Sequence, residues 1–334
     1  MKVKGVIEHI RNSAQLASIL EVSGYPKPGN VHRTRDHPDT RYEHFLAGAI
    51  ALGSSVELSA KRGVMASRGK IEISKIGVGR LIRKAVIDVA KSHMDGNTHL
   101  GICLLFIPLS TAAAKTYMEE GEISIPQLRK NFMEIMNSTT ATDTINVYEA
   151  IRIAGTPKDL GEVKDGKFPD IYDKNFRRKI INEDIKLIDV MRESSSYDTV
   201  AKELSNGLEI SSELGYKELM EVYQKTRDIN IAIVHTFLRI LSEYPDTFIA
   251  RKIGLKKVRD IKRAVEIGIK ETEWISETAR EILNLGGLTT EEGKVKLWKF
   301  DDELQKLGDD YNPGTTADLT ATSIMIALLM GLKY

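Results

Sequence analysis

The chain has 334 residues, with 48 Lys and Arg residues against 47 Asp and Glu residues and a formal net charge of +1 at pH 7. Because these charges nearly cancel, no overall field attracts nucleic acid or an anionic membrane, and any anion site must be local. A single cysteine, Cys103, excludes an internal disulfide framework and fits a reducing compartment. Residues 1–15 lack the continuous apolar core of a secretory signal. We therefore expect a cytoplasmic protein with neither nucleic-acid nor membrane partners.

Apolar residues with helical spacing recur along almost the whole chain, beginning with Val6, Ile10, Leu16 and Leu20. Further helices are predicted at 42–60, 78–92, 101–117, 125–136, 143–153, from about 176, and at 204–224, 228–242, 255–285, 290–307 and 316–332. The two most apolar stretches, 99–114 and 317–332, are too short or too polar to span a bilayer and are expected to be core helices.

Two segments depart from the helical pattern. Residues 65–74 (MASRGKIEIS) alternate as a strand would and predict at most one short β-hairpin. Residues 155–174 are rich in Gly, Pro and charge, which predicts a surface excursion. Since no linker divides the chain, the sequence predicts an all-α fold in one large multi-helical domain covering 1–334.

Four polar, glycine-containing strings interrupt the helices at widely separated places. They are residues 26–40 (PKPGNVHRTRDHPDT), 95–101 (DGNTHLG), 245–254 (PDTFIARKIG) and 311–320 (YNPGTTADLT). Each combines a tight turn with small hydroxyls, a carboxylate and often a cation, beside an apolar run. This composition is typical of a polyanion site at helix ends, because the first amides of a helix are unpaired and carry the positive end of its dipole.

The residues of the strings suit a phosphate chain with a metal ion. Gly29, Gly101 and Gly314 would let phosphate approach the backbone, and countercharge could come from Lys27, Arg33, Arg35 and Arg251. Carboxylates beside phosphate repel it unless a divalent cation lies between them, so Asp36, Asp39, Asp246 and Asp318 predict magnesium.

Structural and metallohydrolase interpretations compete with this one. Any single string could be only a turn or a helix cap, and Asp246 with Arg251 could be a surface pair one helical turn apart. Four strings of the same unusual kind favour a binding site.

Five of the seven histidines lie in or beside two strings: His32, His37, His44, His93 and His99. A zinc site built from them would lack paired cysteines. A histidine–aspartate metallohydrolase would need His before Asp, whereas Asp36 precedes His37, and no P-loop string is present.

The ordered strings resemble the motifs of the triphosphoribosyl-dephospho-coenzyme A synthases, which serve citrate lyase and malonate decarboxylase. The matching segments are LEV (20–22), PKPGNV (26–31) with His37 and Asp39, NTHLG (97–101), DT and AR (246–251) and NPGTTADL (312–319). The resemblance implies an all-helical, magnesium-dependent enzyme. In that family a ribose hydroxyl of dephospho-coenzyme A attacks the anomeric carbon of ATP, adenine leaves, and the triphosphate stays on the transferred ribose.

The resemblance and the composition together give a set of expected roles. Catalysis is expected from Glu21, His37, Asp39 and His99. Nucleotide binding is expected from Lys27, Gly29, Arg33, Asn97, Thr98, Gly101, Asp246, Thr247, Arg251, Gly314, Thr315 and Thr316. Magnesium is expected at Asp36, Asp39 and Asp318.

Three departures from the family bear on the acceptor. His32 stands where the family usually has Asp, Thr315 and Thr316 stand where Gly-Ser is common, and the family's G-x-R-G-E-A segment is replaced in the region 193–198 (ESSSYD). The acceptor could therefore be dephospho-coenzyme A or a related molecule. Two other hypotheses stay open: another ATP-using transferase or nucleotide hydrolase on the same scaffold, and a noncatalytic nucleotide-binding or sensor protein. A homodimer is compatible with the sequence.

Overall fold

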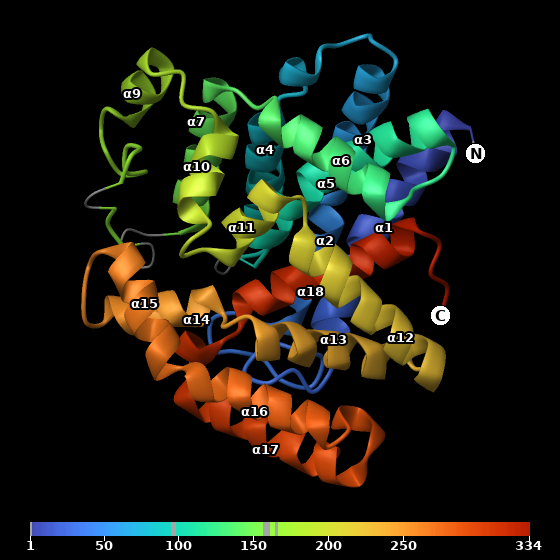
Figure 1. Cartoon of the computed structure of the whole chain (residues 1–334), viewed down its shortest axis with the longest axis vertical. Helices are drawn as coiled ribbons and strands as arrows, with labels where there is room; N and C mark the ends of the chain where they lie inside the picture. The colour runs from blue at the N-terminus through green and yellow to red at the C-terminus, as the bar shows by residue number, and fades with distance from the viewer. Residues whose placement is uncertain (1, 95–97, 156–160, 164–165) are drawn as a thin grey trace.

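The computed structural model describes residues 2–94, 98–155, 161–163 and 166–334. Helices account for the regular structure of these residues (Figure 1), so the predicted all-α class is confirmed. Within the same residues, β-type pairing is limited to two isolated bridges, His32 with Arg35 and Glu162 with Asp260.

The first half of the chain is arranged around helix α5. Its helices are α1 (Val3–Ser23), α2 (Tyr42–Ala51), α3 (Gly53–Ser67), α4 (Val78–Ala90), α5 (Leu100–Glu120), α6 (Ile125–Asn137) and α7 (Ala141–Ala154), with a 3-10 turn η1 (Ile73–Lys75). Every residue of α5 from Gly101 to Thr116 is buried. The helix is long and apolar enough to cross a membrane, but 83% of its apolar window is buried inside the protein. Packing against α1, α3, α6 and α18 accounts for its hydropathy, as expected for a core helix.

The second half adds a lower layer and a central crossing. Its helices are α9 (Phe176–Asn182), α10 (Leu187–Ser194), α11 (Thr199–Asn206), α12 (Tyr216–Thr226), α13 (Ile229–Glu243), α14 (Thr247–Leu255), α15 (Ile261–Glu271), α16 (Glu273–Asn284), α17 (Glu291–Leu307) and α18 (Gly314–Leu329), with a π-helical segment η2 (Ile210–Gly215) and 3-10 turns η3 (Gly287–Thr289) and η4 (Asp309–Tyr311). In Figure 1, α16 and α17 lie together at the bottom, while α13 and α18 cross the middle.

Two apolar clusters share helix α13. One face of this helix, with Ala232, Ile233 and Ile240, packs into the large cluster around α5. Its other face, with Phe237 and Leu241, packs into a smaller cluster formed with α14, α16 and α17. The shared helix therefore connects the upper and lower layers through continuous apolar contacts.

The expected β-hairpin at 65–74 is wrong. Helix α3 continues to Ser67, and the chain then turns into η1. The alternation arises because Ile71 and Ile73 pack against the core from this turn. The carbonyls of Lys75, the last residue of η1, and of Ile76 accept hydrogen bonds from the guanidinium of Arg62.

The predicted surface excursion at 155–174 falls partly outside the described residues, which exclude 156–160 and 164–165. Its described residues are not helical, and they are fixed to the body of the protein. Phe168 and Ile171 pack against the large apolar cluster, and the hydroxyl of Tyr148 donates to the carbonyl of Pro169 at 3.0 Å.

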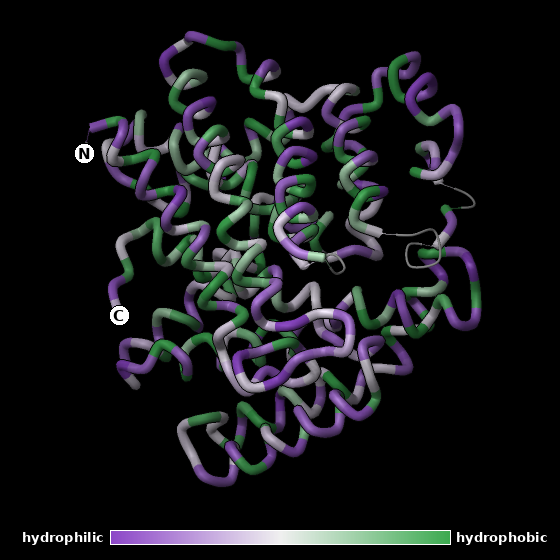
Figure 2. The backbone as a smooth tube through the Cα atoms, turned by 180° about the vertical axis from the view of Figure 1, so that it is seen from behind, coloured by the Kyte–Doolittle hydropathy of each residue, from purple (hydrophilic) through white to green (hydrophobic). Residues whose placement is uncertain are grey.

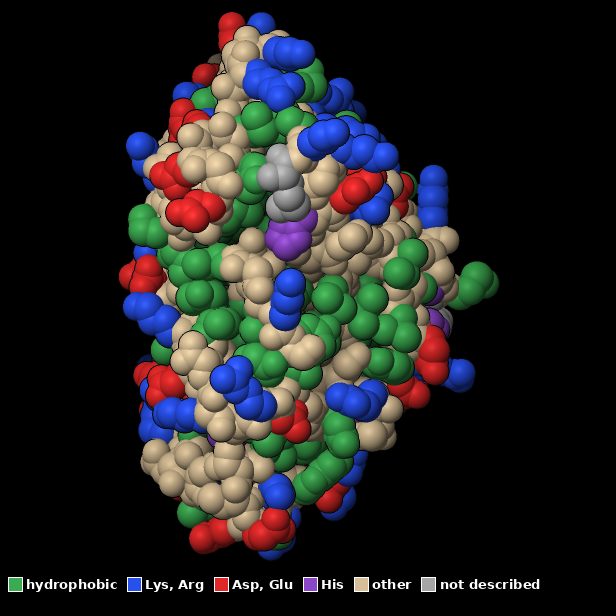
Figure 3. Space-filling view, turned by 90° about the vertical axis from the view of Figure 1, so that its right-hand side faces the viewer, with side chains coloured by type: hydrophobic (Ala, Val, Ile, Leu, Met, Phe, Trp, Pro, Cys, Tyr) green, Lys and Arg blue, Asp and Glu red, His purple; other side chains and the backbone are tan. Residues whose placement is uncertain are grey.

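A long polar loop, residues 24–41, joins α1 to α2 and contains the first of the four strings. Seen from behind in Figure 2, it is a hydrophilic tube between the upper helices and the α16–α17 pair. Side chains of opposite charge are interspersed on the face shown in Figure 3, as the balanced composition predicts.

Candidate active site

The N-termini of α14 and α18 are joined by one buried carboxylate. Asp246 precedes α14, and its Oδ1 accepts hydrogen bonds from the amides of Phe248 and Ile249 at 2.9 and 3.0 Å. Its Oδ2 accepts from the amide and the hydroxyl of Thr316, in the first turn of α18, at 2.7 and 2.8 Å. Asp246 is thus an N-cap for two helices at once, and the surface pair with Arg251 considered from the sequence does not describe it.

Threonine hydroxyls bring a third helix, α11, to the same place. The amide of Thr199 donates to Oγ1 of Thr247 at 3.2 Å. The hydroxyl of Thr247 also lies 3.4 Å from those of Thr199 and Thr315. Asp198, directly before Thr199, caps α11 by accepting from the amide of Ala201 at 2.9 Å.

A fourth helix start, that of α5, lies against Asp318. A methyl group at Gly101 would lie 1.9 Å from Oδ2 of Asp318, so this contact requires glycine. The carboxylate also accepts a hydrogen bond from the amide of Ile102. We call the first turns of α5, α11, α14 and α18, with Asp198, Asp246 and Asp318, the helix-start cluster.

The charged form of Asp318 is strongly destabilised in the helix-start cluster. Burial raises the pKa of this carboxyl well above its ordinary value, and the negative charges of Glu21, Asp246 and Asp198 raise it further. Carboxylates so close to one another favour a bound cation or a proton. The positive ends of four helix dipoles partly offset the repulsion and also attract an anion.

Glu21 and Lys27 form a buried ion pair next to this cluster. Their side chains are 3% and 0% exposed, and the Lys27 ammonium also donates to Oδ1 of Asn30 at 3.0 Å. Burial raises the pKa of Glu21 and lowers that of Lys27, and their mutual attraction opposes both effects. The ammonium group expected to bind phosphate is therefore already bound to a carboxylate.

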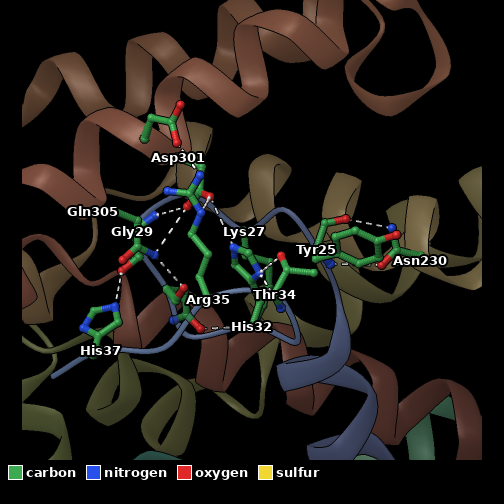
Figure 4. A network of polar contacts seen from close by, with 12 residues as sticks. Tyr25, Lys27, Gly29, His32, Thr34, Arg35, His37, Asn230, Asp301 and Gln305 are labelled. Carbon is green, nitrogen blue, oxygen red and sulfur yellow. Dashed lines mark hydrogen bonds and ion pairs between the residues drawn. The ribbon is translucent and has the colours of Figure 1, made fainter. Parts of the chain in front are cut away.

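Asp301 of α17 organises the PKPGN turn (Figure 4). Gly29 has φ +69°, a conformation that favours glycine, and its amide donates to Oδ1 of Asp301 at 3.1 Å. Oδ2 of Asp301 pairs with Nε2 of His32 at 3.2 Å and with Nε of Arg35 at 3.3 Å. The nearby His37 binds the carbonyl of Gly29 through Nε2 at 3.1 Å and Asp309 through Nδ1 at 2.7 Å. These contacts hold the loop on the lower helices.

The loop also reaches the fourth string. The side-chain amide of Asn30 donates to Oδ1 of Asn312 at 2.9 Å, just before α18. In contrast, Arg33 contacts Ser23, the Tyr25 ring and Asn230 at the surface, so it does not join the helix-start cluster. Arg251 lies with its guanidinium carbon 5.2 Å from the centre of the Phe248 ring, which borders Gly314.

The three carboxylates expected to bind magnesium do not form a ready-made site. Asp36 and Asp39 are exposed, and Asp36 accepts from the amide of Tyr42 at the start of α2, at 2.8 Å. Within the described ranges, no group of three or more His, Cys, Asp or Glu side chains is placed to hold a metal ion. Asp318 fits a single-carboxylate role, in which Mg²⁺ takes its other ligands from phosphate and water.

His99 lies in a buried chain of hydrogen bonds. Its Nε2 is 2.9 Å from Oγ of Ser18, its Nδ1 is 2.7 Å from Oγ1 of Thr98, and that hydroxyl is 3.1 Å from Nε2 of His93. Burial lowers the pKa of His99 to about 3. The imidazole is thus neutral near pH 7. Asn97, expected to bind nucleotide, lies outside the described residues.

Sequence reasoning missed three residues of this region, Asp198, Thr199 and Asp301. The first two had a detectable signal, because Asp198–Thr199 repeats the Asp–Thr pair of Asp246–Thr247. The segment 193–198, aligned with the missing family motif, indeed ends at the helix-start cluster. Asp301 had no such signal, since it is one acidic residue among several on an amphipathic helix.

The fold and site define an all-helical protein in which several helix N-termini converge on buried carboxylates. The family model described as CitG, ATP:dephospho-CoA triphosphoribosyl transferase, matches residues 7–334, and the chain belongs to this family of transferases. The chain also resembles the crystal structure of a candidate triphosphoribosyl-dephospho-coA synthase from Archaeoglobus fulgidus, with a TM-score of 0.55 and 24% identity. That likeness covers 84% of this chain and 99% of the other and supports the fold. No curated protein sequence matches.

Proposed function

We propose that this protein transfers the triphosphoribosyl group of ATP to a ribose hydroxyl of dephospho-coenzyme A and releases adenine. Family membership supports the reaction. The structural observation that carries the proposal is the convergence of four helix N-termini and three threonine hydroxyls around Asp318. Helix dipoles and threonine hydroxyls gathered in this way can attract a triphosphate without a P-loop.

In this proposal the triphosphate binds at the helix-start cluster, near the positive ends of the helix dipoles and through the hydroxyls of Thr247 and Thr315. Mg²⁺, when bound, would neutralise phosphate charge, with Asp318 as its carboxylate partner. The raised pKa of Asp318 supports this role, because repulsion from Glu21, Asp198 and Asp246 is relieved by a cation.

The bond changes define what the protein must supply. The acceptor oxygen forms a bond to C1′ of the ATP ribose while the bond from C1′ to the adenine nitrogen breaks, and the electron pair leaves with the base. The acceptor hydroxyl loses a proton, and adenine gains one. Positive charge that develops at the ribose is stabilised by nearby carboxylates.

Glu21 is the best-placed candidate for the base. Its charge lies close enough to raise the pKa of Asp318, and burial raises the pKa of Glu21 itself, so its carboxylate takes up a proton more readily than an exposed one. His37, in contrast, has both ring nitrogens engaged by Gly29 and Asp309, and Asp39 is exposed in the loop. His32, which replaces the family's Asp, binds Asp301 and Thr34. His32 therefore contacts the loop and α17, and none of these contacts reaches the helix-start cluster.

Product analysis tests the reaction. The protein would be incubated with MgCl₂, ATP and dephospho-coenzyme A, and with ATP alone as a control. We expect free adenine together with an acceptor whose mass has increased by the triphosphoribosyl group. Release of ADP or inorganic phosphate without adenine would favour the nucleotide hydrolase hypothesis, and nucleotide binding without turnover would favour a sensor. A soluble, reducing compartment that contains ATP, such as the cytoplasm, suits this chemistry.

A further inference from the structure

A cavity of about 240 Å³ lies beside the first turn of α5, next to the hydrogen-bonded chain of His93 and His99. Its apolar walls come from the end of α4, the start of α5 and the end of α7, and include Val86, Val89, Leu100, Cys103 and Ala154. Burial and the nearby charges of Asp318 and Asp88 raise the pKa of the Cys103 thiol, so this wall is uncharged and inert.

The cavity and Asp318 border the same helical turn. Leu100 and Cys103 line the cavity, while Gly101, between them in sequence, contacts Asp318. A ligand whose charged end lies at the helix-start cluster could therefore place an uncharged end in the cavity.

The size and the polar wall of the cavity restrict that uncharged end. An apolar cavity of about 150 Å³ accepts benzene, and sites for drug-sized ligands begin at about 300 Å³. The observed volume lies between them and suits one bicyclic ring. His93 and His99 form the polar wall. The His93 ring stacks on that of His44, with centroids 5.2 Å apart and planes inclined by 12°. Flat heteroaromatic rings bind well against such rings.

We propose that this cavity binds the adenine base of a nucleotide, an inference that rests on the proposed function for the position of the phosphates. Adenine fits because it is flat, bicyclic and uncharged, with an edge that exchanges hydrogen bonds with imidazole or hydroxyl groups. Both ATP and dephospho-coenzyme A contain this base. Because the cavity borders the same helical turn as Asp318, we favour the base of ATP, the leaving group.

The test fills the cavity with a larger side chain and measures the binding of Mg-ATP and tripolyphosphate by calorimetry. Ala154, the last residue of α7, lines the cavity, and Ala66, near the end of α3, is a matched control: both are partly buried and pack against the same apolar cluster. We expect Ala154→Phe to weaken Mg-ATP binding by at least about tenfold and to leave inorganic tripolyphosphate binding unchanged, because only the base loses its space. Ala66→Phe should bind both probes like the wild type. Should Ala154→Phe fail to fold, Ala90→Phe at the exposed edge of the cavity replaces it.

Two further probes identify the source of the base. If Ala154→Phe weakens the binding of dephospho-coenzyme A but not that of ATP or pantetheine, the cavity holds the adenine of the acceptor. Unchanged binding of both nucleotides, or weakened binding of pantetheine, would overturn the proposal. The outcome is separate from that of the transfer reaction, since ATP binding that depends on the cavity would stand even if no adenine were released.

Discussion

The carboxylate of Asp246 binds both the amide and the hydroxyl of Thr316, although 70 positions separate the two residues in the chain. Because the other oxygen of Asp246 caps α14, this contact fixes the start of one helix relative to the start of another. The threonine hydroxyls near them are thereby held in place before any ligand arrives. Such preorganisation reduces the ordering cost of binding an anion.

Replacing Asp246 should destabilise the fold more than replacing an ordinary helix cap. Asp246→Ala removes a cap and leaves the buried amide and hydroxyl of Thr316 without their acceptor, so we expect a loss of about 2–4 kcal/mol in the free energy of unfolding. Asp260→Ala, which removes the cap of α15, is the control and should cost about 1 kcal/mol. Urea denaturation measures both, and equal losses would contradict the double-capping role.

Gly101→Ala should damage nucleotide binding through Asp318. The added methyl group would lie 1.9 Å from Oδ2, so the carboxylate or the start of α5 must move. We expect Mg-ATP affinity to fall by about tenfold or more. Because the two changes act on one contact, adding Gly101→Ala to Asp318→Ala should cause little further loss. Additive effects in this double-mutant cycle would show that Gly101 acts independently of Asp318.

Asp318→Asn should stabilise the free protein while weakening magnesium-dependent nucleotide binding. A carboxyl whose folded pKa is raised holds its proton longer in the folded state, so stability falls as pH rises from about its ordinary value of 3.8 through the raised value. Each unit of raised pKa corresponds to about 1.4 kcal/mol, and the neutral amide removes that loss. Chemical denaturation without nucleotide should show the variant to be more stable than the wild type at pH 7 and similar to it at pH 3. A variant less stable than the wild type at pH 7 would show that the fold does not destabilise the charged form of Asp318.

Variants of the Glu21–Lys27 pair can distinguish its structural role from a catalytic role of Glu21. Lys27→Ala leaves a buried carboxylate without its partner, so we expect a loss of about 3–5 kcal/mol. The double variant Glu21→Gln with Lys27→Met should recover most of this stability because it removes both charges. If Glu21 is the base, the recovered protein should still bind Mg-ATP but release adenine at least about 100-fold more slowly. Wild-type turnover in that variant would exclude Glu21 from catalysis.

His99 predicts a specific loss of stability in acid. Its folded pKa of about 3 lies below the ordinary value of 6.5, so the unfolded chain takes up a proton that the folded protein refuses. Stability from this group is complete above pH 6.5 and falls by about 1.4 kcal/mol per pH unit below it, until about pH 3. His99→Gln should flatten this part of the stability profile, as measured by denaturation between pH 7 and 4. Parallel profiles for variant and wild type would refute the assignment.

Helix content was predictable because apolar residues recur with helical spacing in α13 and α17 and fill nearly all of α5 and α18, whereas the breaks between helices were not predictable. The single helix expected at 255–285 is two helices, α15 and α16, because α14 ends at Leu255 and the chain reverses before α15. The helix expected at 204–224 is interrupted at Gly207 and Leu208, which both have positive φ, and the carbonyl of Gly207 accepts a hydrogen bond from Arg129 of α6. Such breaks depend on contacts with distant segments, which local spacing does not contain.

Parts of the strings lie together in the structure, but the sequence did not predict the direction of their side chains. Asp246, Thr247, Thr315 and Gly101 meet because each begins a helix, and helix starts can be read from the sequence. Charge alone was a poor guide: Arg33, Asp36 and Asp39 lie at the surface of the loop, and Lys27 is occupied by Glu21. Whether a charged residue faces a ligand or a buried partner is decided by tertiary packing. The roles of these residues in binding and catalysis stay predictions.

The wide spacing of the helix starts has a consequence for fragments and folding intermediates. Leu100, Thr199, Thr247 and Gly314 begin helices that are distributed over most of the chain, so no shorter stretch contains all the donors that meet around Asp318. A truncated or half-folded chain would retain helices but lose the anion site. Recovery of nucleotide binding during refolding should therefore coincide with the last step of folding. Binding of a nucleotide analogue would then report whether the chain is intact and fully folded.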